Sequence, residues 1–139
     1  MHKYDVIFVV SAGNHSLWKN SNSIEGIIDD DDIQIASPAE SYLALTVGAI
    51  NDKDDPDSIT HLRELSPYSR IGLGFAGCEK PDLVSFGGNI SNRNSSIFGT
   101  KVISTNGNCE SVSGTNFSAP VVSGHLNYSY LSLRLPSPA

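Results

Sequence analysis

The sequence predicts an α/β domain in which a mainly parallel sheet packs against one buried helix. Two apolar runs rich in β-branched residues, Asp5–Ser11 and Leu43–Ile50, are typical of strands that are buried on both faces. The first run is closed by the turn-forming residues Ala12, Gly13 and Asn14. Near the C-terminus, apolar residues recur at alternating steps of four and three, which indicates a helix with one apolar stripe. This stripe consists of Phe117, Val121, Gly124, Tyr128, Leu131 and Leu135.

Size and charge limit the classes of function. The 139 residues are enough for one compact domain with a sizeable core. A net charge of −6 argues against nucleic-acid binding, because affinity for phosphates depends largely on Lys and Arg. Apolar runs fall short of the roughly 20 residues that span a bilayer, and the opening residues MHKYDVIFVVSAGN lack the pattern of a signal peptide. We therefore expect no nucleic-acid and no membrane partner.

The segments between the predicted strands are polar. Residues 15–37 contain the acidic run Asp29–Asp32 and predict a surface insertion, and residues 51–65, which begin with NDKDDPDS, predict a second loop insertion. A Gly-rich passage follows and reaches KPDLVSFGG at 80–88. Lys101–Thr105 predicts a short strand ahead of an Asn-Gly turn at 106–107.

The helix start is fixed by a proline. Pro120 is tolerated only close to the first turn of a helix, because proline lacks the backbone N–H and crowds the preceding turn. The helix is therefore expected to begin just before Pro120, with Asn116 at or beside its N-terminus.

Blocks of the sequence resemble, in order, the subtilisin-like serine proteases. The blocks are FVVSAGN at 8–14, SPAESYLALTVGAI at 37–50, EKPDLVSFGGNI at 79–90 and SGTNFSAPVVSGH at 113–125. Ser85-Phe86 stands in the third block where the family usually has Ala-Pro. The resemblance covers residues 5 to about 133 and implies that residues 1–135 form a partial subtilase catalytic domain, its C-terminal part, followed by a tail at 136–139.

The resemblance implies a set of site residues. Asn14 takes the place of the oxyanion-hole asparagine, whose side-chain amide donates to the developing negative charge. Ser11, Ala12 and Gly13 would line the pocket for the substrate side chain, while Gly114 and Thr115 would let the substrate backbone pass closely. Asn116 occupies the position of the nucleophile. Asn14 and Asn116 should therefore lie close in space.

Two departures from the family pattern affect the activity. The family's aspartate and histidine motifs, D-[ST]-G and H-G-T, do not occur in this sequence, and a carboxamide at Asn116 is not a usable nucleophile for acyl transfer. Ser118 should point away from the site, about 200° round the helix. The histidines, interpreted as surface or interface residues, are His2, His15, His61 and His125.

Three functions remain open from the sequence. The first is an incomplete, inactive segment of a subtilisin-like serine endopeptidase, whose parent hydrolyses peptide bonds through an acyl-enzyme. The second is a pseudoprotease that binds a peptide or protein partner without cutting it. The third is an unrelated α/β binding domain. The variant KPDLVSFGGN resembles bacterial subtilases that accompany an AAA-type ATPase, which implies such a partner and a cytoplasmic location, with secretion as the alternative.

No cofactor or metal is predicted with a defined ligand pattern. The acidic residues could supply oxygen ligands to calcium or form a solvated face, and they are Asp29–Asp32, Asp52, Asp54, Asp55 and Asp57. Cys78 and Cys109 lack the spacing of a zinc site. They could form a disulfide or remain as two buried thiols.

Overall fold

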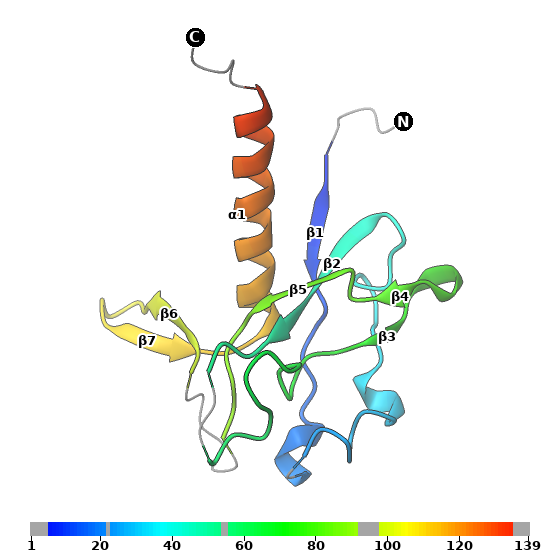
Figure 1. The fold of residues 1–139 in the computed structure, drawn as a ribbon, viewed down its shortest axis with the longest axis vertical. Helices are drawn as coiled ribbons and strands as arrows, with labels where there is room; N and C mark the ends of the chain where they lie inside the picture. The colour runs from blue at the N-terminus through cyan, green and yellow to red at the C-terminus, as the bar shows by residue number, and fades with distance from the viewer. Residues whose placement is uncertain (1–5, 22, 54–55, 92–97, 135–139) are drawn as a thin grey trace.

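A three-stranded parallel sheet organises the fold (Figure 1). The computed structural model describes residues 6–21, 23–53, 56–91 and 98–134, with only the backbone for 130–134. The strands are β1 (Phe8–Ser11), β2 (Ala44–Ile50) and β5 (Leu83–Phe86), in the order β1-β2-β5. Phe8 pairs with Ala44, and Val47 pairs with both Ser11 and Leu83. The predicted α/β class and the two predicted strands are confirmed. The expected burial of the first strand on both faces is wrong, because β1 lies at the edge of the sheet and its Phe8 is 64% exposed.

Two small antiparallel ladders complete the strands. β3 (Gly72–Leu73) pairs with β4 (Glu79–Lys80), and β6 (Thr100–Ile103) pairs with β7 (Cys109–Val112). Three short 3-10 turns lie at η1 (Leu17–Asn20), η2 (Asp31–Ile33) and η3 (Phe75–Gly77). The strand predicted at 101–105 is β6. β7 is not expected from the sequence, because its residues CESV lack an apolar alternation.

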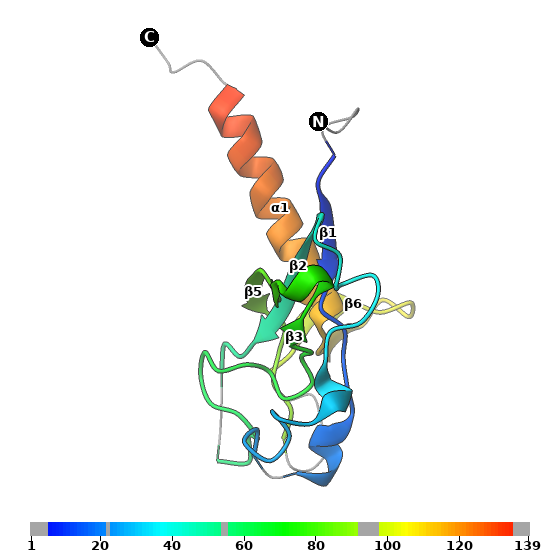
Figure 2. The same cartoon turned by 90° about the vertical axis from the view of Figure 1, so that its right-hand side faces the viewer.

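One long helix, α1 (Thr115–Arg134), packs across one face of the sheet and then continues past its end (Figures 1 and 2). Val9, Leu45 and Val47 on the sheet contact a helix face formed by Ala119, Val122 and Leu126.

The predicted apolar stripe of α1 is wrong. Val121 is 40% exposed and Tyr128 is 75% exposed, whereas the neighbouring Val122 is 9% exposed. Val121 and Val122 are both apolar, so the sequence offers two helical faces, and the sheet covers the second. The helix is also buried only over its first turns, because the sheet ends before the helix does. The side chain of Leu131 and all of Leu135 lie outside the described residues.

Part of the segment expected to be a surface insertion is buried, and Ile35 packs against the other face of the sheet. Within residues 15–37, three isoleucines are buried, namely Ile27, Ile33 and Ile35. Ile35 packs with Ala12, Ala39 and Val10 of the sheet's second face. Because these isoleucines are buried, the expectation of a surface segment is wrong. They are separated by polar residues at irregular intervals, so the sequence shows no helical or strand periodicity there. In the same way, Ile59 and Thr60 of the second predicted insertion are buried.

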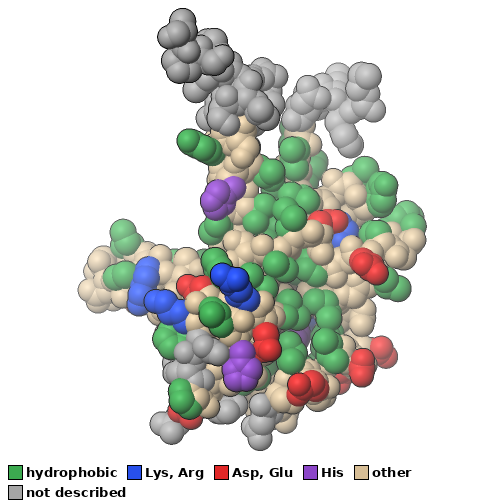
Figure 3. Space-filling view, in the orientation of Figure 1, with side chains coloured by type: hydrophobic (Ala, Val, Ile, Leu, Met, Phe, Trp, Pro, Cys, Tyr) green, Lys and Arg blue, Asp and Glu red, His purple; other side chains and the backbone are tan. Residues whose placement is uncertain are grey.

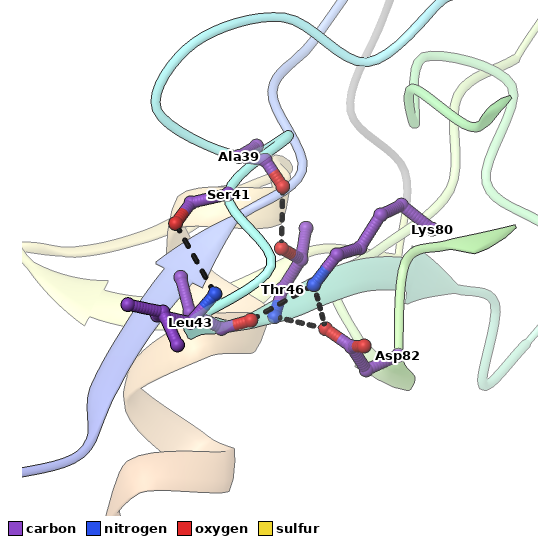
Figure 4. A network of polar contacts seen from close by, with 7 residues as sticks. Ala39, Ser41, Leu43, Thr46, Lys80 and Asp82 are labelled. Carbon is purple, nitrogen blue, oxygen red and sulfur yellow. Dashed lines mark hydrogen bonds and ion pairs between the residues drawn. The ribbon is translucent and has the colours of Figure 1, made fainter. Parts of the chain in front are cut away.

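A charged network fixes the beginning of β2 against the approach to β5 (Figure 4). The Nζ of the buried Lys80 donates to the Ala44 carbonyl at 2.8 Å and to Asp82 Oδ2 at 2.6 Å. The backbone N–H of Thr46 donates to the same carboxylate oxygen at 2.7 Å. Burial alone would raise the pKa of Asp82, but the hydrogen bonds from Lys80 and Thr46 outweigh it and hold this pKa below its ordinary value.

Both cysteines are free thiols. Cys109 on β7 is exposed and Cys78 is partly exposed, so the expectation of two buried thiols is wrong. In the part of the chain that the structure describes, no helix has the length and apolar character needed to cross a membrane.

Candidate functional site

The end of β1 and the start of α1 meet at Asn14. The backbone N–H of Thr115 donates to Asn14 Oδ1 at 3.1 Å, and the Thr115 hydroxyl donates to the same oxygen at 3.0 Å. In turn, the backbone N–H of Gly13 donates to Thr115 Oγ1 at 3.1 Å. The first N–H groups of a helix have no partner within it, and Asn14 supplies one from a strand 101 positions away.

The turn after β1 depends on Gly13. Its φ of +93° is rarely adopted by residues with a side chain, and an added Cβ would lie 3.0 Å from Arg70 Cδ. Arg70 encloses this turn from outside: its backbone N–H donates to Gly13 O at 3.1 Å and its guanidinium donates to Asp32 O at 2.6 Å. Sequence reasoning missed Arg70, since its partners are backbone carbonyls that no motif marks.

Asn116 is the second residue of α1 and lies beside Asn14. A Cβ built on Gly114 would meet the Nδ2 of Asn14 at 3.2 Å and would also meet Asn116 Oδ1. Both carboxamides therefore border the same point, and the expected proximity of Asn14 and Asn116 is present. Both residues are exposed, so the pair is open to solvent.

A cavity of about 540 Å³ lies between β1 and the first turns of α1 and opens beside Asn116. It is lined by Ile7, Phe8, Val9, Ser11, Asn116, Ala119, Pro120 and Ser123. Its strand side is apolar and open, with Ile7 68% and Phe8 64% exposed. Figure 3 shows hydrophobic side chains at the surface where β1 runs next to α1.

The remaining predicted site residues are less accessible. Ser11 lines the cavity, but Ala12 is buried in the core of the opposite sheet face with Ile35 and Ala39. Gly114 and Thr115 are buried, and the Thr115 side chain is used in the contacts with Gly13 and Asn14. Ser11 and Ala12 differ because successive side chains of an extended chain point to opposite faces of the sheet.

The histidines do not gather at Asn116 within the described residues. His125 lies exposed on α1, with its Nδ1 2.9 Å from Val121 O, and His61 is exposed, whereas His2 lies outside the described residues. His15, expected at the surface or at an interface, is partly buried. Burial, with a smaller contribution from the Arg70 charge, lowers the pKa of His15.

Ser118 packs as expected. Its side chain is fully buried and its hydroxyl donates to Ser85 O at 3.2 Å, beneath the helix. This serine therefore faces the sheet and not the cavity.

The acidic segment at Asp29–Asp32 is held by local hydrogen bonds. Asp30 Oδ1 accepts the N–H of Asp32 at 2.9 Å, which caps η2. Across the described residues, no three His, Cys, Asp or Glu side chains gather as metal ligands. Asp54 and Asp55, also considered for calcium, lie outside the described residues.

The chemistry available at this site follows from its donors. The amide nitrogen of Asn14 and the positive end of the α1 dipole both favour negative charge on an oxygen placed beside Asn116. An amide side chain at Asn116 offers neither a hydroxyl nor a thiol for attack on a carbonyl. The arrangement can bind and polarise a carbonyl group.

Comparison with known proteins adds the family context. The model of the subtilase family matches residues 1–129 of the chain. A curated relative from Sinorhizobium fredii (strain NBRC 101917 / NGR234), uncharacterized protein y4bN, is 33% identical over 102 residues. The match covers 62% of this chain and 24% of the relative, so the chain spans about a quarter of the relative's length. No solved structure matches the chain significantly.

Proposed function

Because this chain belongs to the subtilase family, we propose that it carries the oxyanion-binding and substrate-binding side of a subtilisin-like peptidase site. We further propose that it does not cleave peptide bonds by itself. The observation that carries this proposal is the fixed orientation of Asn14. Its Oδ1 accepts two hydrogen bonds from Thr115, which leaves Nδ2 on the side of Gly114 and Asn116.

A fixed donor suits this role physically. An oxyanion donor contributes most when it is already aimed at the position where negative charge develops, because it then needs no reorganisation during the reaction. Thr115 holds Asn14 by two contacts, one of them from the backbone of α1. The same contacts bring the helix N-terminus to the site.

The proposed lack of cleavage follows from two missing groups. Acyl transfer needs a nucleophile and a base that removes its proton. Asn116 takes the nucleophile position in this proposal, and no described histidine lines the cavity beside it. Binding of a peptide carbonyl remains available.

The first experiment measures hydrolysis of a chromogenic peptide and labelling by a fluorophosphonate. We expect neither turnover nor labelling in the unmodified chain. Labelling at any serine would contradict the assignment of Asn116 to the nucleophile position.

A second experiment restores the nucleophile. Asn116→Ser in this chain should stay close to inert, because in subtilisin the loss of the catalytic histidine alone lowers turnover by about 2 × 10⁶. The same change in a longer chain that supplies the family's Asp and His should become active. There, Asn14→Asp keeps an oxygen for Thr115 but removes the amide donor, and it should lower turnover by about a hundred- to a thousandfold.

The alternative function, a pseudoprotease that binds peptides, is favoured by the cavity beside Asn116. Its volume of about 540 Å³ and its apolar wall at Ile7 and Phe8 fit an extended peptide with hydrophobic side chains. Titration of the unmodified chain with casein-derived peptides separates the two functions. Binding without turnover, even in the longer chain with Asn116→Ser, would favour the pseudoprotease.

A further inference from the structure

A closed ring of hydrogen bonds surrounds the candidate site, and Tyr68 enters it twice. On one side the Tyr68 carbonyl accepts the N–H of His15 at 2.9 Å, directly after Asn14. On the other side the Tyr68 hydroxyl donates to Gly87 O at 2.6 Å, its nearer acceptor, while Gly88 O lies 3.0 Å from the same hydroxyl. The same Gly87 oxygen accepts the N–H of Gly114 at 3.0 Å, directly before Thr115.

The ring closes through the site itself. Asn14 Oδ1 accepts the N–H and the hydroxyl of Thr115, so the path runs from His15 through Asn14, Thr115 and Gly114 to Gly87 and back to Tyr68. A carbonyl oxygen has two lone pairs, so Gly87 O can accept from Gly114 and Tyr68 together. One residue from a third segment thus bridges the end of β1 and the start of α1.

The surroundings of Tyr68 keep this bridge rigid. The side chain is 3% exposed and its ring packs with Ala49, Ile59 and Ile90. Gly87 is held equally closely, because an added Cβ would lie 2.7 Å from Ala49 Cβ. Burial raises the pKa of Tyr68 to about 12, so the hydroxyl keeps its proton and remains a donor.

We propose that Tyr68 is a positioning residue that sets the separation between the Asn14 carboxamide and the N-terminus of α1. It does so without contacting the cavity. Packing of the aromatic side chain alone would stabilise the core. In addition, the Tyr68 carbonyl acts directly on the segment that carries Asn14, and the Tyr68 hydroxyl acts through Gly87 on the segment that carries Asn116. The consequence for substrate rests on the proposed function, whereas the positioning itself is a property of the free chain.

The test uses the ¹⁵N-labelled chain and amide hydrogen exchange measured by NMR. Tyr68→Phe keeps the packing of the aromatic side chain and removes only the hydroxyl. We expect the amides of Gly114 and Thr115 to exchange about tenfold faster relative to those of β2, with a shift of the Asn14 side-chain resonance. A purely structural role would accelerate exchange uniformly across the sheet.

Thr46→Val is the matched control. Thr46 is also fully buried and its hydroxyl also donates to a backbone carbonyl, that of Ala39 at 2.6 Å, at the far end of β2. We expect this variant to leave the ratio of Gly114 to β2 exchange unchanged. Equal ratios in the two variants, whether raised or unchanged, would overturn the proposal.

Thr115→Val opens the ring from its opposite side, and it serves as the test if Tyr68→Phe does not fold. The ring predicts faster exchange at the His15 amide, whose acceptor is Tyr68 O, and an unchanged His15 amide would contradict it. Failure of every peptide to bind would remove the proposed function, but it would leave these exchange ratios and the role of Tyr68 as measured.

Discussion

The two ends of β2 are held by different kinds of polar contact. At its beginning, the ammonium of Lys80 and the carboxylate of Asp82 bind Ala44 and Thr46 (Figure 4). Near its carboxyl end, the ring through Asn14, Thr115 and Tyr68 contains only neutral groups. Both ends have a defined register, and a cavity lies beside each. Leu43, next to Ala44, lines one of about 680 Å³, and Asn116 lines one of about 540 Å³.

The contrast between charged and neutral contacts shows which polar atoms remain available to bind another molecule. The positive charge of a buried ammonium must be offset by nearby acceptors. The Ala44 carbonyl and the Asp82 carboxylate are therefore occupied by Lys80. A neutral carboxamide can be held by its oxygen alone, and its nitrogen then stays available. The charged end is therefore suited to stability, and the neutral end to binding.

The largest expected effect is on the charged end. Asp82→Asn leaves the Lys80 ammonium buried without its counter-charge. It should lower the free energy of unfolding by about 3 kcal/mol, the low end for a buried pair, because the Asp82 side chain is 34% exposed. Because the folded pKa of Asp82 lies below its unfolded value, this stabilisation is present above about pH 4 and is lost as pH falls through the folded pKa. Urea denaturation across pH measures both. If the difference in unfolding free energy between wild type and Asp82→Asn did not change as pH falls, the ion pair between Lys80 and Asp82 would be contradicted.

The next effect is at the neutral end and appears in alkali. The pKa of Tyr68 is about 12 in the folded chain and near 10 when unfolded, so its contribution is complete below pH 10. It falls as pH rises from 10 to 12, by about 3 kcal/mol in total. The measurement is the difference in unfolding free energy between wild type and Tyr68→Phe. A difference that stays constant over this range would show that the hydroxyl is solvated.

A smaller effect separates the two atoms of the Asn14 carboxamide. Asn14→Ala removes the acceptor for Thr115 and should cost about 1–2 kcal/mol, as loss of a helix cap does. Asn14→Asp keeps an oxygen for Thr115 and adds a negative charge at the helix N-terminus, so its stability should match or exceed the wild type. Thermal unfolding compares them. Equal losses in both variants would mean that the nitrogen also holds the fold.

The smallest effect is along α1. Tyr128→Ala should change the free energy of unfolding by less than about 0.5 kcal/mol, because the side chain is 75% exposed. Val122→Ala, on the buried face, should cost about 1–3 kcal/mol. Comparable losses would restore the apolar stripe expected from the sequence.

The parts of this molecule that depend on local sequence patterns could be predicted from the sequence. β1 and β2 follow from β-branched runs. Asn116 lies beside the start of α1 as expected, but Pro120 lies inside the helix and not in its first turn. The proximity of Asn14 and Asn116 was expected from the family resemblance of the two sequence blocks that contain them. The helix face was misassigned because Val121 and Val122 are both apolar, and only the sheet decides between them.

Other parts depend on contacts that no local pattern encodes. Arg70 and Tyr68 act on backbone carbonyls of distant segments, and any residue type can present a carbonyl. The buried isoleucines of 15–37 are spaced irregularly, since the described part of that segment has only the short 3-10 turns η1 and η2 as regular elements. Such roles become visible only when the segments are placed in space.

The cap that Asn14 provides to α1 also constrains how the chain folds. The two partners lie 101 positions apart, so the helix start can be completed only after most of the chain has been collapsed around it. Contacts of such long sequence separation slow folding, because loop closure costs entropy before the contact forms. During synthesis, β1 and its turn leave the ribosome before Thr115, so the cavity beside Asn116, which needs residues from both β1 and α1, can form only after the start of α1 has been made.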